Sequence, residues 1–567
     1  MKRKVLWVVF VGLLLGISIA LLWQGQDSLA SPEENEAWIV GIIQDNHNAP
    51  VEEVQVTLHA SGSDAPLSET LTQADGHYTL VMPKEIPDSL SIQISRSHFR
   101  SIEINLTSEE IQNLKSGRTI TKPAITLERQ IGAAFWIATI IFVLVLVLIA
   151  TGVFHNTLAA LTGTALLFVV SYLGRPFSET LFIFNFHGAI KYIDWNVIFL
   201  VMGMMILIAV IENTGIFQWL SYFAYRISGG RVWLLIPVLM LITGIASAFL
   251  DNVTTMLLMT PISVQIALAI GINPLAMIIP EVFASNVVGV STLVGTPTNI
   301  LIGSYGDISF NDFLANLTPG VILAFVGLII YSLLTFKKDL SQAKTASPEL
   351  LAMLAERGKI TKPEHLKKAG VVGAGMLLLF IFGERLHLVP AVTALVSATA
   401  LMVWIKPDIE EMIDAVDWTT LVFFMSLFIV VGAIQEVGLI SIIADSIGKM
   451  VGDSLVLTML SVIWLGAILS VFVANIPFTA AMLPIVGYLT LTVPGAETKV
   501  LYYCLSIGAA LGGNGSLIGA SANMVTAGIS NSVGYPITYA TFFKKGFPAM
   551  LITVTLATLW LLLHFLL

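Results

Sequence analysis

The chain repeats a set of residues at a nearly constant distance, and this internal repeat constrains its fold more than any other feature. Asp194-Trp195 returns as Asp417-Trp418, 223 positions later. Six further residues recur at the same offset, namely Gly215, Ser247, Phe249, Asn252, Met259 and Pro261 as Gly438, Ser470, Phe472, Asn475, Met482 and Pro484. Gly295 and Asn299 recur as Gly519 and Asn523 at an offset of 224, so one residue has been added between the two sets. Small or polar residues that recur within apolar segments are typical of a membrane transporter whose site lies between two internal repeats.

The composition places most of the chain in a lipid bilayer. Hydrophobic residues make up 56% of the 567 residues and charged residues only 11%, with a mean hydropathy of +0.86. Such a chain cannot fold as a water-soluble globule throughout. The net charge of −9 is modest and unevenly distributed, so it gives no indication of nucleic-acid binding. Cys504 is the only cysteine, which excludes an intrachain disulfide and a thiolate metal cluster.

Residues 1–30 have the features of an export signal or a membrane anchor. A basic stretch at residues 2–4 precedes an apolar run at residues 5–23, and Ser28-Leu29-Ala30 offers the small residues of a cleavage site. Because the apolar run is long enough to span a membrane, we expect an uncleaved anchor, with a cleaved signal peptide as the alternative. In both cases the next segment is exported.

Residues 36–128 predict a small β-sandwich, because charges, turns and period-2 alternation replace long apolar runs. Val54, Val56 and Leu58 alternate as in a strand, and Ala74-Asp75-Gly76-His77 indicates a turn. The spacing of Gly41, Pro50-Val51, Val56-Thr57-Leu58 and Asp75-Gly76 with Tyr78 resembles the carboxypeptidase regulatory-like domain, a fold usually found outside cells. The segment shows no catalytic constellation, so we expect a stabilising or docking module.

From Ile131 onward the chain consists of apolar segments of spanning length. The first repeat, residues 131–336, contains crossings near residues 133–151, 157–173, 194–211, 274–305 and 317–336. The second repeat, residues 369–567, contains crossings near residues 369–383, 388–405, 418–435, 500–525 and 545–566. Residues 337–368 form a polar linker with eight basic side chains, which predicts a cytoplasmic linker.

The order of these crossings predicts a hairpin in each repeat. If the β-domain is outside, the first three crossings end inside the cell at Ile211. The cytoplasmic linker follows two further crossings, so the segment between Ile211 and those two crossings must cross the membrane an even number of times. Residues 213–229 are aromatic-rich and fit a helix at the cytoplasmic surface. Residues 231–270 then form a re-entrant hairpin or a tight helical pair, which parity alone does not separate. Residues 454–494 form the matching hairpin.

Each repeat therefore has five crossings and one hairpin, and this odd number of crossings inverts the second repeat in the membrane. The predicted fold class is a polytopic α-helical membrane protein with two inverted repeats of five transmembrane helices plus one re-entrant hairpin each, and a small N-terminal β-sandwich domain. The two hairpin tips should approach each other near the midplane.

Two glycine-rich loops interrupt apolar spans at corresponding places. Residues 294–299 read Val-Gly-Thr-Pro-Thr-Asn, and residues 512–523 contain Gly-Gly-Asn-Gly-Ser followed by Ile-Gly-Ala-Ser-Ala-Asn. Broken helices at membrane depth persist only where they are buried in protein or line a cavity. Unwound backbone there offers carbonyl groups to a cation and helix N-termini to an anion. The alternative is that small residues simply let helices pack closely.

Two acids lie within apolar sequence, Asp251 at the first hairpin tip and Glu281 shortly before the first glycine-rich loop. An acid at membrane depth is costly, so both are candidates for carrying a proton or pairing with a cation. The alternative for Asp251 is an N-cap on the second hairpin helix, and Glu281 would alternatively lie nearer an interface. Ala474 stands where Asp251 has its second copy, so the two repeats are not chemically equivalent.

The motifs around these loops resemble those of the ArsB/NhaD permeases. The segments are residues 247–258 (Ser-Ala-Phe-Leu-Asp-Asn-Val-Thr-Thr-Met-Leu-Leu), residues 475–480 (Asn-Ile-Pro-Phe-Thr-Ala) and residues 511–523. They look closest to the P protein-like branch of this family, within the ion transporter superfamily and its citrate-transporter-like fold. The resemblance covers residues 131–567. It departs at Gly295-Thr296-Pro297-Thr298-Asn299, where the branch has Gly-Asp-Pro-Pro-Asn, and the missing acid leans toward the carboxylate carriers.

The resemblance implies a carrier with a scaffold part and a moving part that holds both hairpins. Relatives exchange sodium for protons, expel arsenite or import di- and tricarboxylates with sodium. The implied substrate and ion site comprises Asp251, Asn252, Thr254, Gly295, Thr296, Thr298, Asn299, Asn475, Thr479, Asn514, Gly515, Gly519, Ser521 and Asn523. We expect no cofactor, and no metal other than a transported Na⁺.

We expect ion-coupled secondary transport of a small inorganic or organic ion, driven by Na⁺ or H⁺, in a multi-pass protein of the plasma membrane. A membrane sensor with a ligand-binding β-domain and a passive channel are the alternatives, and the channel is disfavoured because nothing resembles a ring-built selectivity filter. No P-loop, nucleophile elbow or HExxH motif is present, so we do not expect an enzyme. The predicted partners are the bilayer and small ions, and the sequence leaves a monomer and a homodimer both open.

Overall fold

The computed structural model describes residues 37–46, 50–60, 65–83, 85–342, 356 and 358–566. The chain divides into two compact units, Met1–Gln130 and Ile131–Leu567, and each is described by itself. The predicted anchor or signal peptide at residues 1–30 lies outside the described residues.

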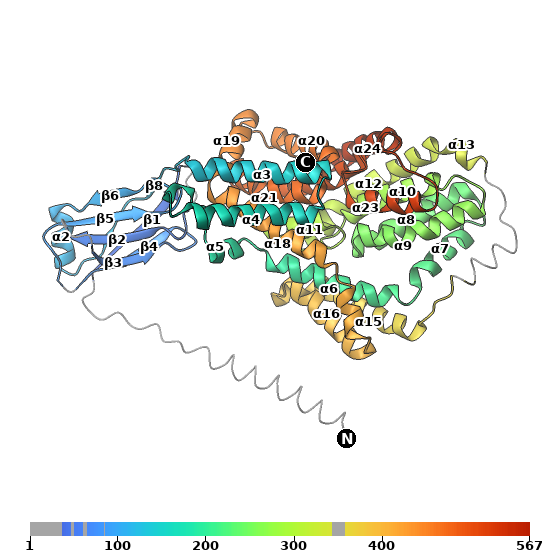
Figure 1. Cartoon of the computed structure of the whole chain (residues 1–567), viewed down its shortest axis with the longest axis horizontal. Coiled ribbons are helices and arrows are strands. Elements are labelled where there is room, and N and C mark those ends of the chain that lie inside the picture. Colours follow the sequence, from blue (N-terminus) through green and yellow to red (C-terminus); the bar gives the residue numbers. More distant parts are fainter. Residues whose placement is uncertain are drawn as a thin grey trace, which may run out of the picture. The chain divides into compact units, whose positions relative to one another are not determined.

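The first unit is a sandwich of two four-stranded sheets (Figure 1). One sheet contains β4 (His77–Val81), β1 (Trp38–Asp45), β7 (Ile120–Thr121) and β8 (Ile125–Leu127), and the other contains β3 (Pro66–Leu71), β2 (Gln55–Ala60), β5 (Leu90–Ser95) and β6 (Ile102–Asn105). Alternate residues of β1 are buried, as period-2 alternation requires. Ile39, Val56 and Ile92 are fully buried between the sheets, and one helix, α2 (Ser108–Lys115), completes the unit.

The second unit is helical, and its two repeats have the same helices in the same order. The first repeat contains α3 (Ala133–Thr151), α4 (Asn156–Gly174), α5 (Phe186–Lys191), α6 (Trp195–Glu212), α7 (Ile216–Ile227), α8 (Val232–Phe249), α9 (Asn252–Ala269), α10 (Leu275–Gly289), α11 (Pro297–Tyr305) and α12 (Phe310–Thr335). The second contains α15 (Pro363–Phe382), α16 (Pro390–Ile405), α17 (Ile409–Asp414), α18 (Trp418–Glu436), α19 (Leu439–Val451), α20 (Leu455–Phe472), α21 (Asn475–Thr492), α22 (Val500–Gly512), α23 (Ser521–Ser532) and α24 (Tyr539–Leu566). Within the described residues, 11 helices are long and apolar enough to cross a membrane.

Helix ends differ from the sequence-based bounds where the first turn of a helix is polar. α12 begins at Phe310 and α24 at Tyr539, several residues before the apolar windows that predicted them, because Asp312 and Lys544 lie within their first two turns. α15 begins at Pro363 and thus takes up the last residues of the predicted linker. A hydropathy window omits polar turns that a helix continues through, so it finds the apolar part of a helix better than its ends.

Each predicted hairpin is a pair of 18-residue helices joined by two residues, α8 with α9 and α20 with α21. At 1.5 Å per residue each of these helices is about 27 Å long. α7, which joins α6 to the first hairpin, is amphipathic, as expected for a helix at a membrane surface.

The helices of the second unit form two groups, and both groups mix the two repeats. The scaffold group consists of α3, α4, α6, α15, α16 and α18, in which α4 packs on α18 and α6 packs on α16. The hairpin group consists of α8–α12 and α20–α24, in which α9 packs on α23 and α11 packs on α21. Figure 1 shows α3, α4 and α18 side by side, and α8, α9 and α10 together in another part of the unit. Neither repeat could bury its apolar faces without the other.

Candidate substrate and ion site

Asp251 occupies the tip of the first hairpin and caps α9. Its Oδ1 accepts hydrogen bonds from the backbone N–H groups of Val253 (2.8 Å) and Thr254 (2.9 Å), and its Oδ2 accepts one from Thr254 Oγ1 (2.5 Å). Asp251 is therefore an N-cap, as the sequence allowed, because its carboxylate accepts from the free N–H groups of the first turn of α9.

The tip of the second hairpin has no such cap. Ala474 precedes α21 and offers no side-chain acceptor, and Ala520 precedes α23 in the same way. The backbone N–H of Asn475 instead donates to Gly519 O at 3.2 Å, which ties the hairpin tip to the second glycine-rich loop. In the first turns of these two helices the N–H groups of Ile476, Ser521 and Ala522 therefore have no side-chain cap, whereas Asp251 caps α9.

The two glycine-rich loops are held by matching hydrogen bonds. Asn299 Nδ2 donates to the carbonyl oxygens of Val290 (2.9 Å) and Thr292 (2.8 Å), and Asn523 Nδ2 donates to those of Gly513 (2.8 Å) and Ser516 (2.8 Å). Gly295 N donates to Thr292 Oγ1 at 3.0 Å, and Gly519 N donates to Ser516 Oγ at 3.1 Å. Asn299 and Asn523 are fully buried, so their amide groups serve to satisfy unwound backbone.

Gly295 and Gly519 allow each loop to approach the neighbouring hairpin helix. A Cβ atom at Gly519 would lie 2.8 Å from Ser470 O and 2.7 Å from Gly513 O. A Cβ atom at Gly295 would lie 2.9 Å from Ser247 O and closer still to Gly289 O. Because Ser247 and Ser470 are themselves repeat equivalents, the same close packing is built twice.

A network of buried amides joins the two repeats, and its central residue, Asn286 of α10, was not predicted. Asn286 Oδ1 accepts from Asn252 Nδ2 (2.8 Å), and Asn286 Nδ2 donates to Asn514 Oδ1 (2.8 Å) and Asn523 Oδ1 (3.0 Å). A further hydrogen bond joins the repeats, because Ser506 Oγ of the second repeat donates to Asn299 Oδ1 of the first at 2.6 Å. An isolated polar Ser285-Asn286 pair in an apolar helix was the sequence signal that could have indicated it.

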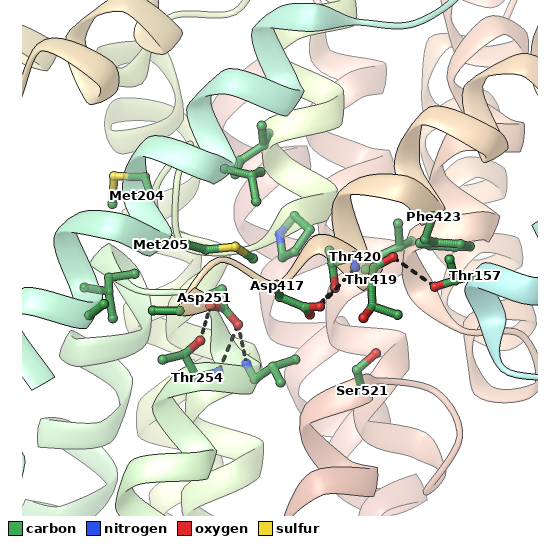
Figure 2. A pocket seen from close by; sticks show the side chains of 18 of the residues that line it. Thr157, Met204, Met205, Asp251, Thr254, Asp417, Thr419, Thr420, Phe423 and Ser521 are labelled. Atoms are coloured by element: carbon green, nitrogen blue, oxygen red, sulfur yellow. Dashed lines mark hydrogen bonds between the residues drawn. The ribbon is translucent and has the colours of Figure 1, made fainter. Parts of the chain in front are cut away.

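A cavity of about 470 Å³ lies between the scaffold group and the tips of the hairpin group. Its lining includes Val201, Met204, Met205, Ile208 and Glu212 of α6, Thr419, Thr420 and Phe423 of α18, the tip residues Asp251, Thr254 and Ile476, and Pro297, Ile300 and Ser521 from the helices that follow the loops. Figure 2 shows Asp251 directed at Thr254 and Asp417 directed at Thr420, and both side chains line the cavity together with Ser521. Asp417 caps α18 as Asp251 caps α9, accepting hydrogen bonds from Thr420 N and Thr420 Oγ1.

Of the predicted site residues, Asp251, Thr254 and Ser521 line this cavity. The others lie behind the lining as buried residues of the tips and loops, namely Asn252, Gly295, Thr296, Thr298, Asn299, Asn475, Thr479, Asn514, Gly515, Gly519 and Asn523. Thr296 and Thr298 bond to each other at 2.7 Å, and Thr479 Oγ1 donates to Asn475 O at 2.7 Å. The structure therefore brings the predicted residues to one region and separates those that face the cavity from those that shape it.

The cavity lining carries acids and no strong base. Glu212, Asp251 and Asp417 contribute three carboxyl groups and His155 an imidazole, and the described lining contains no Lys or Arg. Asp417 and His155 were not among the predicted site residues, because they belong to scaffold helices that meet the hairpin tip only in the folded protein. Among the described residues, no group of three His, Cys, Asp or Glu side chains is placed to hold a metal ion.

Comparison with known proteins places the chain among transporters. The citrate transporter family model matches residues 145–496. The 46 kDa membrane protein of Mycobacterium leprae is 36% identical over 434 residues, which cover 76% of this chain and 99% of that protein. The P protein of Homo sapiens is 32% identical over 504 residues, which cover 75% of this chain and 59% of that protein.

A solved structure supports the fold. The crystal structure of the Alcanivorax borkumensis YdaH transporter matches with a TM-score of 0.52 and 13% identity, covering 76% of this chain and 98% of that one. The description of the family model fits a transporter and not an enzyme. With a family model that matches more than half of its length and relatives matched almost end to end, the chain belongs to the citrate transporter family and is a multi-pass membrane transporter.

Proposed function

We propose that this protein is an ion-coupled secondary transporter that moves a small inorganic or organic ion by alternating access, with Na⁺ or H⁺ as the coupling ion. The observation that carries the proposal is the cavity of about 470 Å³, which has the scaffold group on one side and the tips of both repeats on the other. Movement of the hairpin group against the scaffold group would change which side of the membrane this cavity faces.

A second cavity supports this movement. It has a volume of about 500 Å³ and is lined by Asn196 and Leu200 of α6, whereas the first cavity is lined by Val201 to Glu212 of the same helix. Ile300 of α11 lines both cavities, and we propose that its side chain is part of an apolar layer that separates the two spaces along α6. Such a layer is what a carrier requires, because a continuous pore would dissipate the gradient.

The substrate class follows from the unequal tips. The first repeat presents the Asp251 carboxylate, which favours a cation. The second repeat presents the uncapped first turns of α21 and α23 at Ile476 and Ser521, which favour an anionic group. We therefore infer that a carboxylate of the citrate type is carried together with a cation, and we leave the sodium–proton exchange and arsenite export of the ArsB/NhaD resemblance as alternatives for the test.

We further propose a plasma-membrane location with the β-sandwich outside and the basic linker in the cytoplasm. Lys337, Lys338 and Lys359 belong to this linker, and basic loops stay on the cytoplasmic side. An odd number of passes separates the β-sandwich from the end of α6, so the first cavity would open to the cytoplasm in this structure. The carboxypeptidase regulatory-like character of the β-sandwich is part of the same proposal.

The test is flux into liposomes that contain the purified full chain. Citrate and other carboxylates, arsenite, sodium and protons are screened under imposed sodium and proton gradients. We expect carboxylate uptake that requires one of the two gradients. Uptake that proceeds at the same rate without any gradient, and passes ions continuously in electrical recordings, would identify a channel and contradict the proposal.

A further inference from the structure

Glu281 lies near the middle of α10, and its side chain is buried inside the hairpin group. Its exposed fraction is 1%, and it is not among the residues that line the cavities of about 470, 500 and 430 Å³. Ser263 Oγ of α9 donates to Glu281 Oε2 at 2.9 Å, and Thr243 Oγ1 of α8 donates to the same oxygen at 3.3 Å. The carboxyl group therefore sits where α8, α9 and α10 of the first repeat meet.

Its other oxygen, Oε1, is buried and has no hydrogen-bond partner in the described residues. Thr260 Oγ1, one helical turn before Ser263 on the same face of α9, is also buried and unpartnered. An ionised carboxylate would thus be held by two neutral donors only, with one oxygen left bare. Such a group neutralises itself by taking up a proton or a cation.

No charged side chain of the surrounding helices faces Glu281. α8, α9 and α23 contain no ionisable side chain, and Glu281 is the only one in α10. The ionisable side chains on the other helices that contact α10 are Asp312 and Tyr331 of α12, Tyr502, Tyr503 and Cys504 of α22, and Tyr539, Lys544, Lys545 and His564 of α24. Lys545 lies over the Phe336 ring at 4.1 Å, and His564 contacts Asn316 at 2.9 Å. Asp312 accepts hydrogen bonds from Ser309, and Lys544 is exposed, so none of these four groups is placed against the buried Glu281.

The second repeat builds the same hairpin without this polar cluster. At the offset of 223, Thr243, Thr260 and Ser263 correspond to Gly466, Leu483 and Val486. At the offset of 224, which also relates Gly289 to Gly513, Glu281 corresponds to Leu505. All three apolar residues are buried, with exposed fractions of 3% for Leu483 and 0% for Val486 and Leu505. Packing of the fold therefore does not require polar groups here, and apolar residues fill the matching positions.

We propose that Glu281 is a proton-binding site found only in the first repeat, occupied by a proton while the hairpin is packed as in this structure. The proton comes from water when movement of the hairpin group hydrates the carboxylate, and it returns to water when the site is hydrated again. The Ser263 and Thr243 hydroxyls can donate to Oε2 in both forms, so the site stays ordered as the proton arrives and leaves. The link to movement rests on the proposed transport function, and it would make the proton the coupling ion.

Infrared difference spectroscopy of the full chain in lipid tests the site without any transport assay. We expect the C=O stretching band of a buried protonated carboxylic acid near neutral pH, its loss in Glu281→Gln, and its retention in the matched control Asp251→Asn. A wild-type protein without the band, or a band that persists in Glu281→Gln, would overturn the proposal. Bound radioactive sodium that disappears in Glu281→Gln would also overturn it, in favour of a sodium site.

A second variant keeps the test decisive if Glu281→Gln does not fold. The set Thr243→Gly, Thr260→Leu, Ser263→Val and Glu281→Leu copies the second repeat into the first, and we expect it to insert in the membrane and to lack the band. In liposomes its flux should lose all dependence on a proton gradient, and unchanged dependence would refute the coupling role. A protein that shows the band but moves no solute would instead refute the proposed function and leave the proton site standing.

Discussion

At the scale of single residues, Asp251 is both a helix cap and a side chain of the cavity lining. Its carboxylate caps α9, and its side chain lines the cavity together with that of Asp417 (Figure 2). Asp194 caps α6 in the same way, with Asn196 N at 3.0 Å, but it lines neither of the two cavities along α6. Capping alone therefore does not set Asp251 apart, and its place at the cavity does.

The Asp251→Asn variant separates the two roles of the side chain. An amide oxygen still accepts from Val253 N and Thr254 N, so we expect normal membrane insertion and stability. We expect coupled flux to lose its dependence on sodium or pH, because the variant has no charge at the tip. Asp194→Asn is the matched control and should leave the dependence unchanged. Retained dependence in Asp251→Asn would leave the residue with capping alone.

The Gly295→Ala variant tests whether the glycine-rich loops are shaped by close packing. An added Cβ would overlap Gly289 O and lie 2.9 Å from Ser247 O, so the loop or α8 must shift. We expect a loss of about 1–3 kcal/mol in stability, as for other overpacked cores, seen as a lower unfolding temperature in detergent. Gly528→Ala in α23 has nothing within 4 Å of its new Cβ and should be neutral or slightly stabilising. Equal unfolding temperatures for the two variants would contradict this account.

At the scale of elements, short polar interactions fix where the helices begin. Asp251 starts α9, Thr296 starts α11 by accepting from Asn299 N, and Thr107 starts α2 in a capping box with Glu110. The cap of α2 also connects to a residue outside its helix. Glu110 pairs with Lys122 at 2.5 Å, and this Lys side chain is only 9% exposed.

The Glu110 pair predicts a pH-dependent stability of α2. Partial burial raises the pKa of Glu110, but the Lys122 ammonium and the Thr107 backbone N–H outweigh it and hold the pKa below its usual value of 4.5. The stabilisation is therefore present above pH 4.5 and is lost as the pH falls through the lowered pKa. We expect Glu110→Gln to cost on the order of 1 kcal/mol at neutral pH and nothing in strong acid.

Hydrogen exchange of the α2 amides, compared between variant and wild type at each pH, measures this effect. Glu109→Gln is the control, because Glu109 lies in the same first turn and is exposed. Equal protection in Glu110→Gln and wild type at neutral pH would show that the ion pair does not stabilise the helix.

At the scale of the whole molecule, the two repeats depend on each other. α4 packs on α18 and α9 on α23, and Thr164 Oγ1 of one repeat donates to Ser426 O of the other at 3.1 Å. The transporter unit therefore forms one interdigitated body, while the β-sandwich has its own core of residues such as Ile39 and Leu58. Removing the sandwich removes none of the helices that surround the cavity.

Deletion of residues 36–128 tests the carrier against the sensor alternative. We expect the shortened protein to insert and to carry out coupled flux at a rate within about twofold of the full chain, since a buried transporter core is retained. Transport rates are measured in liposomes at matched protein density. A shortened protein that elutes as a single folded species but moves no solute would favour a β-domain that controls the membrane unit.

The sequence by itself determined the membrane fold, the two repeats, the hairpins and the interrupted loops. These features depend on local properties, because apolar length, recurring Gly and Asn residues and capping acids can be found by moving along the chain. The polar residues of the hairpin tips and loops were found for the same reason, and three of them, Asp251, Thr254 and Ser521, line the cavity.

Only the tertiary structure decided which polar side chains face open space and which satisfy buried backbone. Asn299 and Asn523, which were predicted as site residues, hold the loops with their amides, and Asn286 joins the two repeats from α10, where the sequence had pointed only to Glu281. His155 and Asp417 reach the cavity because scaffold helices of different repeats pack side by side. A side chain's surroundings depend on helices hundreds of residues away, and helical periodicity within one segment carries no information about those distant neighbours.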